Sequence, residues 1–191
     1  MEYICHYDSF LGGITMASDG KALTGLWFDG QTYFADTLEI EHTQETVPVL
    51  EETIRWLDLY FSGKNPDFTP PLHMKTTAFR KRVWEILLDI PYGRTMTYAQ
   101  IAGIIAQERG IKKMSAQAVG GAVGHNSISL IIPCHRVVGS DGSLTGYAAG
   151  IDKKAALLTL EGGCRWRQSA RRIASTASGN SPDLRYTRVM L

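Results

Sequence analysis

The sequence predicts an α+β protein in which a small antiparallel-sheet N-terminal domain precedes a helical, winged helix-turn-helix-like domain. Three observations predict it: strand-like segments between glycine turns at the start, a proline-rich joint, and helical periodicity beyond that joint. We place the first domain at residues 1–72, its linker at about 62–74 and the second domain at residues 75–163. Residues 164–191 form a basic tail, which we expect to be flexible.

Short strands are expected first, because apolar and β-branched residues cluster between turn signals such as Asp19-Gly20. The predicted strands are Glu2–Tyr7, Gly13–Ser18 and Ala22–Phe28. An amphipathic helix follows and lies against this sheet, since apolar residues recur there at helical spacing. Its stripe consists of Leu50, Ile54, Leu57 and Phe61.

Three helices are expected after the linker. The stripe of the first is Phe79, Val83, Leu87 and Ile90, and Pro91 ends it. Thr97 caps a second helix from Tyr98 to about Arg109, with Gly110 as its stop. The third spans Ser115–Gly124, with Ser115 as its cap. The last two predict a helix-turn-helix, a pattern that ordinary helix pairs share.

Composition narrows the class of protein. Apolar residues make up 44% and charged residues 20% of the 191 residues, which is typical of globular proteins. The chain has no apolar run long enough for a membrane span, and its start does not resemble a leader, so we expect a cytoplasmic protein without a membrane partner. Three cysteines without ligand spacing favour free thiols over disulfides or a metal site.

The charge is divided unevenly along the chain. Residues 1–72 hold 12 acidic and 3 basic residues, whereas residues 73–191 hold 7 acidic and 17 basic ones. A basic second domain favours a nucleic-acid partner, because cationic side chains neutralise phosphates. The alternative is that the two oppositely charged parts attract each other.

The third helix carries an unusual bare face. Gln117, Gly120, Gly121 and Gly124 recur at the spacing of one helical face, although each interior glycine costs roughly 1 kcal/mol relative to alanine. Such a face lets a DNA backbone approach closely. Tight packing against a neighbouring helix is the alternative, and the basic residues before the helix favour DNA.

Cys134 is the candidate nucleophile. The apolar run Ser129–Ile132 predicts a strand, and Cys134 follows it with His135 and Arg136 beside it. A free thiol is only slightly ionised at neutral pH, so a reactive cysteine needs a base or a positive charge nearby. Inert core packing, the usual state of a lone cysteine, is the alternative.

Pro133-Cys134-His135-Arg136-Val137 resembles the active-site signature of the O6-alkylguanine-DNA alkyltransferases, the methylated-DNA–protein-cysteine methyltransferases. The resemblance covers residues 76–163 and includes Pro91-Tyr92-Gly93, Ala118–Ala122 and Gly146-Tyr147. It implies an enzyme for DNA repair that flips O6-methylguanine out of the duplex. The alkyl group then passes irreversibly to Cys134, once per protein and without a cofactor.

The resemblance also implies a role for each site residue. His135, oriented by Glu161, takes the thiol proton through a water, and Tyr98 neutralises the departing guanine. Asn126 ties the helix-turn-helix to the active-site segment. Substrate and DNA contacts are expected from Gln117, Gly120, Gly121, Arg136, Val137, Tyr147 and Ala148.

Three departures from the family pattern stand out. Gln117 replaces the arginine that many members use to fill the gap left by the flipped base. Cys5 and His6 do not recreate the zinc site of some members, so we expect no metal. The arginine-rich tail lies beyond the resemblance and either adds DNA affinity or has no function.

Two rival functions stay open. The first is a damage-sensing relative that binds alkylated DNA without transfer, although such relatives lack the cysteine that Cys134 supplies. The second is a cysteine hydrolase, in which the cysteine and histidine generally come from distant chain positions. We expect a monomer whose partner is double-stranded DNA containing O6-alkylguanine.

Overall fold

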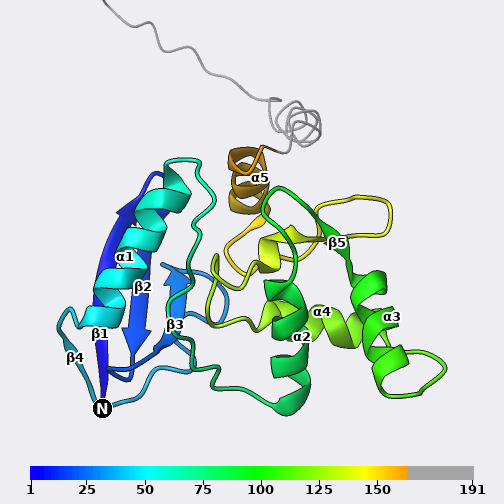
Figure 1. Cartoon of the computed structure of the whole chain (residues 1–191), viewed down its shortest axis with the longest axis horizontal. Coiled ribbons are helices and arrows are strands. Elements are labelled where there is room, and N and C mark those ends of the chain that lie inside the picture. Colours follow the sequence, from blue (N-terminus) through cyan, green and yellow to red (C-terminus); the bar gives the residue numbers. More distant parts are fainter. Residues whose placement is uncertain (163–191) are drawn as a thin grey trace, which may run out of the picture.

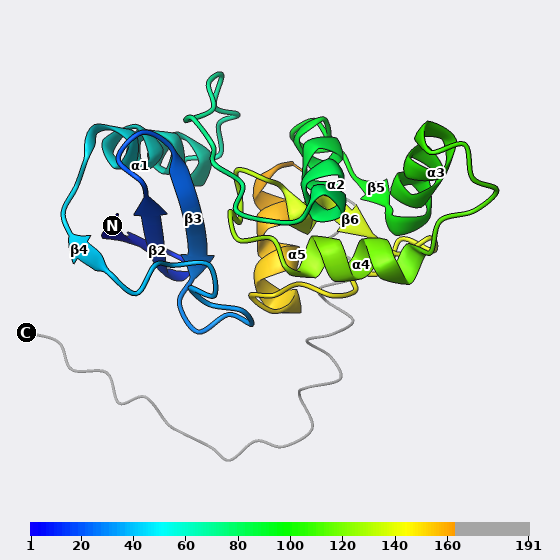
Figure 2. The same cartoon turned by 90° about the horizontal axis from the view of Figure 1, so that it is seen from below.

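The computed structural model describes residues 1–162, which form two halves lying side by side (Figure 1, Figure 2). The amino-terminal half contains β1 (Glu2–Ser9), β2 (Gly12–Ser18), β3 (Leu23–Phe28), β4 (His42–Gln44) and α1 (Pro48–Phe61). The carboxy-terminal half contains α2 (Ala78–Leu88), β5 (Met96–Thr97), α3 (Tyr98–Glu108), α4 (Ala116–Gly124), the 3-10 helix η1 (Cys134–Arg136), β6 (Val137–Val138) and α5 (Ile151–Leu160). The predicted α+β class is confirmed.

The sheet of the amino-terminal half has the strand order β3-β2-β1-β4. The three predicted strands are present, and β2 pairs antiparallel with both β1 and β3. A fourth strand, β4, was not predicted and runs parallel to β1. Its three residues, His42, Thr43 and Gln44, carry no apolar alternation that would reveal a strand.

The edge strand β3 joins the two halves. All of its residues are buried, and helix α1 covers the sheet (Figure 1). The Leu26 N–H donates to the Ser127 carbonyl at 2.8 Å, and the Ser129 N–H donates to the Leu26 carbonyl at 2.9 Å. These bonds fix the segment before Cys134 against the sheet.

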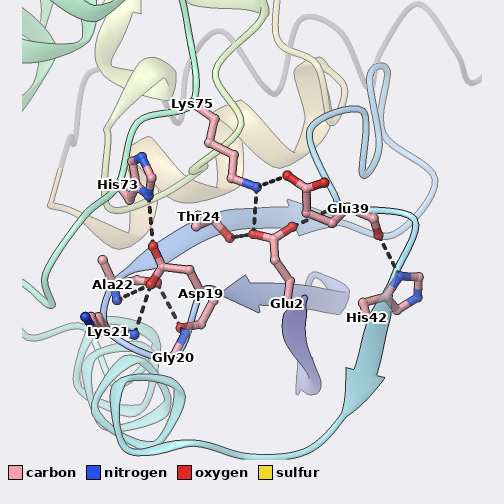
Figure 3. Close-up of polar contacts among 11 residues, drawn as sticks. Glu2, Asp19, Gly20, Lys21, Ala22, Thr24, Glu39, His42, His73 and Lys75 are labelled. Carbon is pink, nitrogen blue, oxygen red and sulfur yellow. Dashed lines mark hydrogen bonds and ion pairs between the residues drawn. The ribbon is translucent and has the colours of Figure 1, made fainter.

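The predicted linker is held against the same sheet. The His73 N–H donates to the Leu23 carbonyl at 2.8 Å. The Lys75 ammonium lies 3.1 Å from the Glu2 carboxylate and 2.8 Å from that of Glu39, and His73 pairs with Asp19 (Figure 3). The extended connection is therefore fastened at its carboxy-terminal end.

The helix-turn-helix is formed by α3 and α4, as predicted. Thr97 and Gln100 make a reciprocal capping box at the start of α3, and Gly110 ends it with a φ of 63°. The Ser115 hydroxyl caps α4 by accepting the Ala118 N–H. A hydrogen bond of 2.9 Å from the Trp84 indole to the Ala122 carbonyl then fixes α4 on α2.

The predicted strand at Ser129–Ile132 is wrong. This segment is a buried turn in which Leu130 has a φ of 69° and the Ile132 N–H donates to the Ile128 carbonyl. A short apolar run indicates burial, but its composition does not distinguish a strand from a buried turn. The turn leads into η1, of which Cys134 is the first residue.

The remaining predictions about the fold concern a membrane span and the carboxy-terminal tail. None of the helices within residues 1–162 is long and apolar enough to cross a membrane. The predicted tail, residues 164–191, lies outside the described residues.

Candidate active site

Cys134 lies at the centre of the candidate site with 4% of its surface exposed. The side-chain amide of Asn126 donates to the Cys134 sulfur at 3.1 Å and to the Ile132 carbonyl at 2.7 Å. The Asn126 carbonyl oxygen accepts the Ile128 N–H at 3.0 Å. Asn126, which follows the end of α4, therefore holds the buried turn and the sulfur together.

His135 and Glu161 form a buried pair beside the cysteine. The His135 Nε2 atom lies 2.7 Å from Glu161 Oε1, and both side chains are fully buried. Glu161 directly follows α5 and also accepts the Gly93 N–H at 3.1 Å. The predicted pairing of these two residues is therefore present in the structure.

The charges of this pair follow from its hydrogen bonds. Burial alone would raise the pKa of Glu161, but hydrogen bonds from His135 and Arg136 hold it at about 2. Burial lowers the pKa of His135 despite the neighbouring carboxylate. At neutral pH the site thus contains an ionised Glu161 and a neutral His135.

Arg136 occupies a different place from the one we expected. Its guanidinium is buried and donates to Glu161 Oε2 at 2.9 Å, to Glu161 Oε1 at 3.0 Å and to the Ile90 carbonyl at 2.6 Å. A side chain bonded in this way is not placed to contact DNA or to assist the thiol. Sequence proximity to Cys134 suggested the wrong partner, because the Arg136 guanidinium bonds Glu161 and the Ile90 carbonyl instead.

Lys154 is the cation that acts on Cys134, and sequence reasoning missed it. Burial raises the pKa of the Cys134 thiol, whereas the Asn126 hydrogen bond and the charge of Lys154 oppose that rise. Burial also lowers the pKa of Lys154 to about 8, since its side chain is inaccessible to solvent. Its position on α5 gave a weak signal, as a lysine on the inner face of a helix is unusual.

A cavity of about 780 Å³ opens beside these residues. Six predicted substrate or catalytic residues line it: Tyr98, Gln117, Gly120, Gly121, Tyr147 and Ala148. Cys134 does not line it, but the charge of its thiolate form raises the pKa of the Tyr98 and Tyr147 phenols beyond the effect of burial. Val137 is buried and pairs with Met96 between β6 and β5.

The bare face of α4 opens into this cavity. A Cβ atom added to Gly121 or Gly124 would meet no atom within 4 Å, and one added to Gly120 would approach the Tyr98 ring at 3.9 Å. The alternative of tight packing against a neighbouring helix therefore does not hold for Gly121 and Gly124.

The amino-terminal half also contributes to the cavity wall, which the sequence did not reveal. The Thr32 N–H donates to the Ala148 carbonyl at 3.0 Å. Tyr33 stacks on His125 with the ring centroids 4.0 Å apart, and its ring lines the cavity. No local pattern around Tyr33 indicates a contact with a residue so distant in the sequence.

Two family models match the chain. The model described as the ribonuclease-like domain of 6-O-methylguanine DNA methyltransferase matches residues 3–74. The model described as the DNA binding domain of the same family matches residues 78–163. The chain belongs to the 6-O-methylguanine DNA methyltransferase family. The resemblance inferred from the sequence around Cys134 is thereby confirmed.

Relatives of this methyltransferase family are similar over most of their length. The methylated-DNA–protein-cysteine methyltransferase of Mycobacterium tuberculosis is 42% identical over 159 residues, 82% of this chain and 92% of the relative. That of Haemophilus influenzae is 37% identical over 160 residues, 83% of this chain and 86% of the relative. The crystal structure of Mycobacterium tuberculosis OGT in complex with DNA is similar with a TM-score of 0.72 at 40% identity, covering 83% of this chain and 92% of that one.

Between residues 1 and 162, no three His, Cys, Asp or Glu side chains are grouped so that they could hold a metal ion. Cys5 is a free, buried thiol on β1.

Proposed function

We propose that this methyltransferase repairs O6-alkylguanine in double-stranded DNA by transferring the alkyl group to Cys134, once per protein molecule. DNA repair by alkyl transfer to a cysteine is the activity of its family. The observation that carries the assignment to Cys134 is the contact of its sulfur with Asn126, next to the buried His135–Glu161 pair. Burial raises the pKa of both thiols, but at Cys134 a hydrogen bond from Asn126 and the charge of Lys154 oppose the rise, whereas at Cys5 burial alone raises the pKa to about 11.

The thiol must first lose its proton. Because Glu161 is ionised, the His135 Nε2 atom facing it carries the ring proton, which leaves Nδ1 as the basic nitrogen. Nδ1 is buried and finds no hydrogen-bond partner within residues 1–162. It accepts the Cys134 proton through a water, while Asn126 and Lys154 stabilise the thiolate.

The thiolate then attacks the alkyl carbon in line with the bond to guanine O6. A sulfur–carbon bond forms, the carbon–oxygen bond breaks, and its electron pair moves into the guanine ring. A proton from the Tyr98 hydroxyl neutralises the guanine. The thiol proton held by His135 then passes through water to the Tyr98 oxygen, so that both side chains end neutral. The products are an alkylated Cys134 and an unmodified guanine, with no cofactor or metal consumed.

The target base must leave the duplex before this step, because its O6 atom is buried in the stacked helix. The cavity has the size of an ordinary small-molecule site and accommodates a purine. The glycine face of α4 allows the DNA backbone to approach, and Gln117, exposed on the same helix, occupies the gap in the base stack. The segment Thr145–Ala148 moves to admit the base, since Cys134 is 4% exposed.

The proposal also includes the oligomeric state of the protein and the compartment in which it works. Residues 1–72 and 75–163 act as two domains of a monomer, with the first supporting the catalytic residues of the second. We infer that the protein works in the cytoplasm on double-stranded DNA.

Incubation with a duplex that carries one labelled O6-methylguanine tests this function. We expect transfer to stop at one label per protein even in excess DNA, and Cys134→Ala to abolish transfer while DNA binding is retained. Repeated turnover would indicate hydrolysis instead. Binding of alkylated DNA without any transfer would indicate a damage sensor.

A further inference from the structure

Tyr60 brings a hydroxyl from the amino-terminal half into the catalytic cluster. It lies on α1 and is fully buried. Its hydroxyl donates to Glu161 Oε1 at 2.8 Å and lies 3.2 Å from His135 Nε2. The two partners stand 101 and 75 positions away in the sequence. Tyr60 thus touches both members of the buried pair but not the thiol.

The aromatic ring of Tyr60 is held firmly in place. Trp56 stacks on it with the ring centroids 5.1 Å apart and the planes 10° apart. Phe61 and Tyr92 pack edge-on against it at 5.5 and 6.1 Å. Because the ring is fixed on three sides, the position of its hydroxyl is fixed as well.

The direction of the Tyr60 hydrogen bond follows from the charge of Glu161. An ionised carboxylate only accepts hydrogen bonds, so the phenol proton lies on the bond to Oε1. The Tyr60 oxygen then presents a lone pair to His135 Nε2. Both neighbours of Nε2 are therefore acceptors, and the neutral imidazole is stable only with its proton on Nε2.

We propose that Tyr60 is a positioning residue which, together with Glu161, holds His135 in the form that keeps Nδ1 free to accept the Cys134 proton. This inference rests on the proposed alkyl transfer and extends its site into the amino-terminal half. That half accordingly supplies part of the proton-transfer geometry in addition to a cavity wall. The family signature around Cys134 contains no residue with this role.

The Tyr60→Phe variant tests the inference, since it removes one oxygen and keeps the ring. Nitrogen NMR of the histidine side chains in the full chain reports which ring nitrogen carries the proton. In the wild type we expect the His135 Nδ1 atom to show the nitrogen chemical shift of an unprotonated ring nitrogen. The Nε2 atom should show the chemical shift of a protonated one. In the variant the two shifts should move toward each other, and the single-turnover transfer rate should fall about 2- to 10-fold, as for the loss of one hydrogen bond.

Tyr7→Phe is the matched control. The Tyr7 hydroxyl also bonds a carboxylate of α1, that of Asp58 at 2.9 Å, but on the exposed side of the helix. We expect this variant to leave the His135 shifts and the transfer rate unchanged.

Unmoved His135 shifts in a folded Tyr60→Phe protein would overturn the inference, whatever the rate. So would an equal loss of rate in Tyr60→Phe and Tyr7→Phe. Because the NMR measurement needs no DNA, it remains decisive even if the wild type failed to transfer an alkyl group, which would refute the proposed function instead.

Discussion

Lys154 and Tyr98 donate hydrogen bonds to the same two backbone carbonyls. The Lys154 ammonium lies 2.7 Å from the Thr145 oxygen and 3.5 Å from that of Gly146. The Tyr98 hydroxyl lies 3.2 and 3.4 Å from the same atoms. In the proposed reaction Tyr98 turns toward the bound guanine. Lys154 can then continue to satisfy both carbonyls, so the cavity wall need not lose its support.

Replacing Lys154 by methionine should slow transfer about tenfold at neutral pH, the effect of raising the thiol pKa by one unit. The substitution removes the positive charge that acts on Cys134 and the donor that holds the Thr145 carbonyl. Single-turnover rates measure the effect. Lys154→Arg keeps the charge and should retain more activity, whereas equal rates for wild type and Lys154→Met would exclude this role.

The Asn126→Ala variant should lose about 10- to 100-fold in transfer rate, because a hydrogen bond to a charged group contributes about 1.5–3 kcal/mol. Its free energy of unfolding should also fall by about 1–3 kcal/mol, since the buried Ile132 carbonyl loses its donor. Chemical denaturation and transfer kinetics measure the two effects. The neighbouring Ser127→Ala is the control, as its buried hydroxyl has no partner in residues 1–162. Equal losses in both variants would contradict the role of Asn126.

How far the sequence predicted the site depends on the distance between partners along the chain. Cys134, His135 and Asn126 lie within one short segment, and their types and order sufficed to suggest chemistry. Tyr60 and Lys154 reach the site through tertiary packing, and only the place of Lys154 on the inner face of its helix gave a weak signal. Arg136 shows the opposite error, since adjacency in sequence suggested a contact with the thiol or with DNA, whereas its guanidinium is bonded to Glu161 and to the Ile90 carbonyl.

Prediction of the fold was limited in the same way, by contacts between residues distant in the sequence. Capping residues such as Thr97 and Ser115 act within one turn, so the starts of α3 and α4 were predictable. The turn at Ser129–Ile132 and strand β4 are instead fixed by bonds to other parts of the protein, through Leu26 and Glu2. Local pattern predicts elements that local interactions stabilise.

Placing alanine at Gly121 or Gly124 should separate folding from DNA binding. The added methyl groups meet open space, so stability should rise by up to about 1 kcal/mol per site. Affinity for duplex DNA should fall, because the methyl groups occupy the face that we propose for the approach of the DNA backbone. Thermal unfolding and titration with labelled DNA provide the measurements. Gly103→Ala on α3 is also unhindered but lies outside the cavity, so a comparable loss of affinity there would contradict the assignment.

Acid stability should depend on Glu161. The carboxyl stays ionised in the folded protein down to about pH 2, whereas its ordinary pKa is 4.5. The contribution of the ionised Glu161 to the free energy of unfolding is therefore complete above pH 4.5. It is lost as the pH falls toward 2, by about 3 kcal/mol in all. The buried His135, whose pKa is lowered, changes stability in the same direction.

Denaturation of the Glu161→Gln variant, from neutral pH down to about pH 2, tests this contribution of Glu161 to stability. The neutral amide has no proton to gain, so the variant should be less stable than wild type at neutral pH, with a shallower loss in acid. Parallel curves for the two proteins would show that Glu161 does not contribute in this way.

Mass spectrometric mapping after reaction with a duplex containing O6-methylguanine tests the central claim most directly. The full chain has three cysteines, so the position of the added methyl group identifies the acceptor. We predict one methyl group per molecule, located on the peptide that contains Cys134, with Cys5 and Cys164 unmodified. A methyl group on either of those cysteines, or guanine repaired without any modified peptide, would contradict the account.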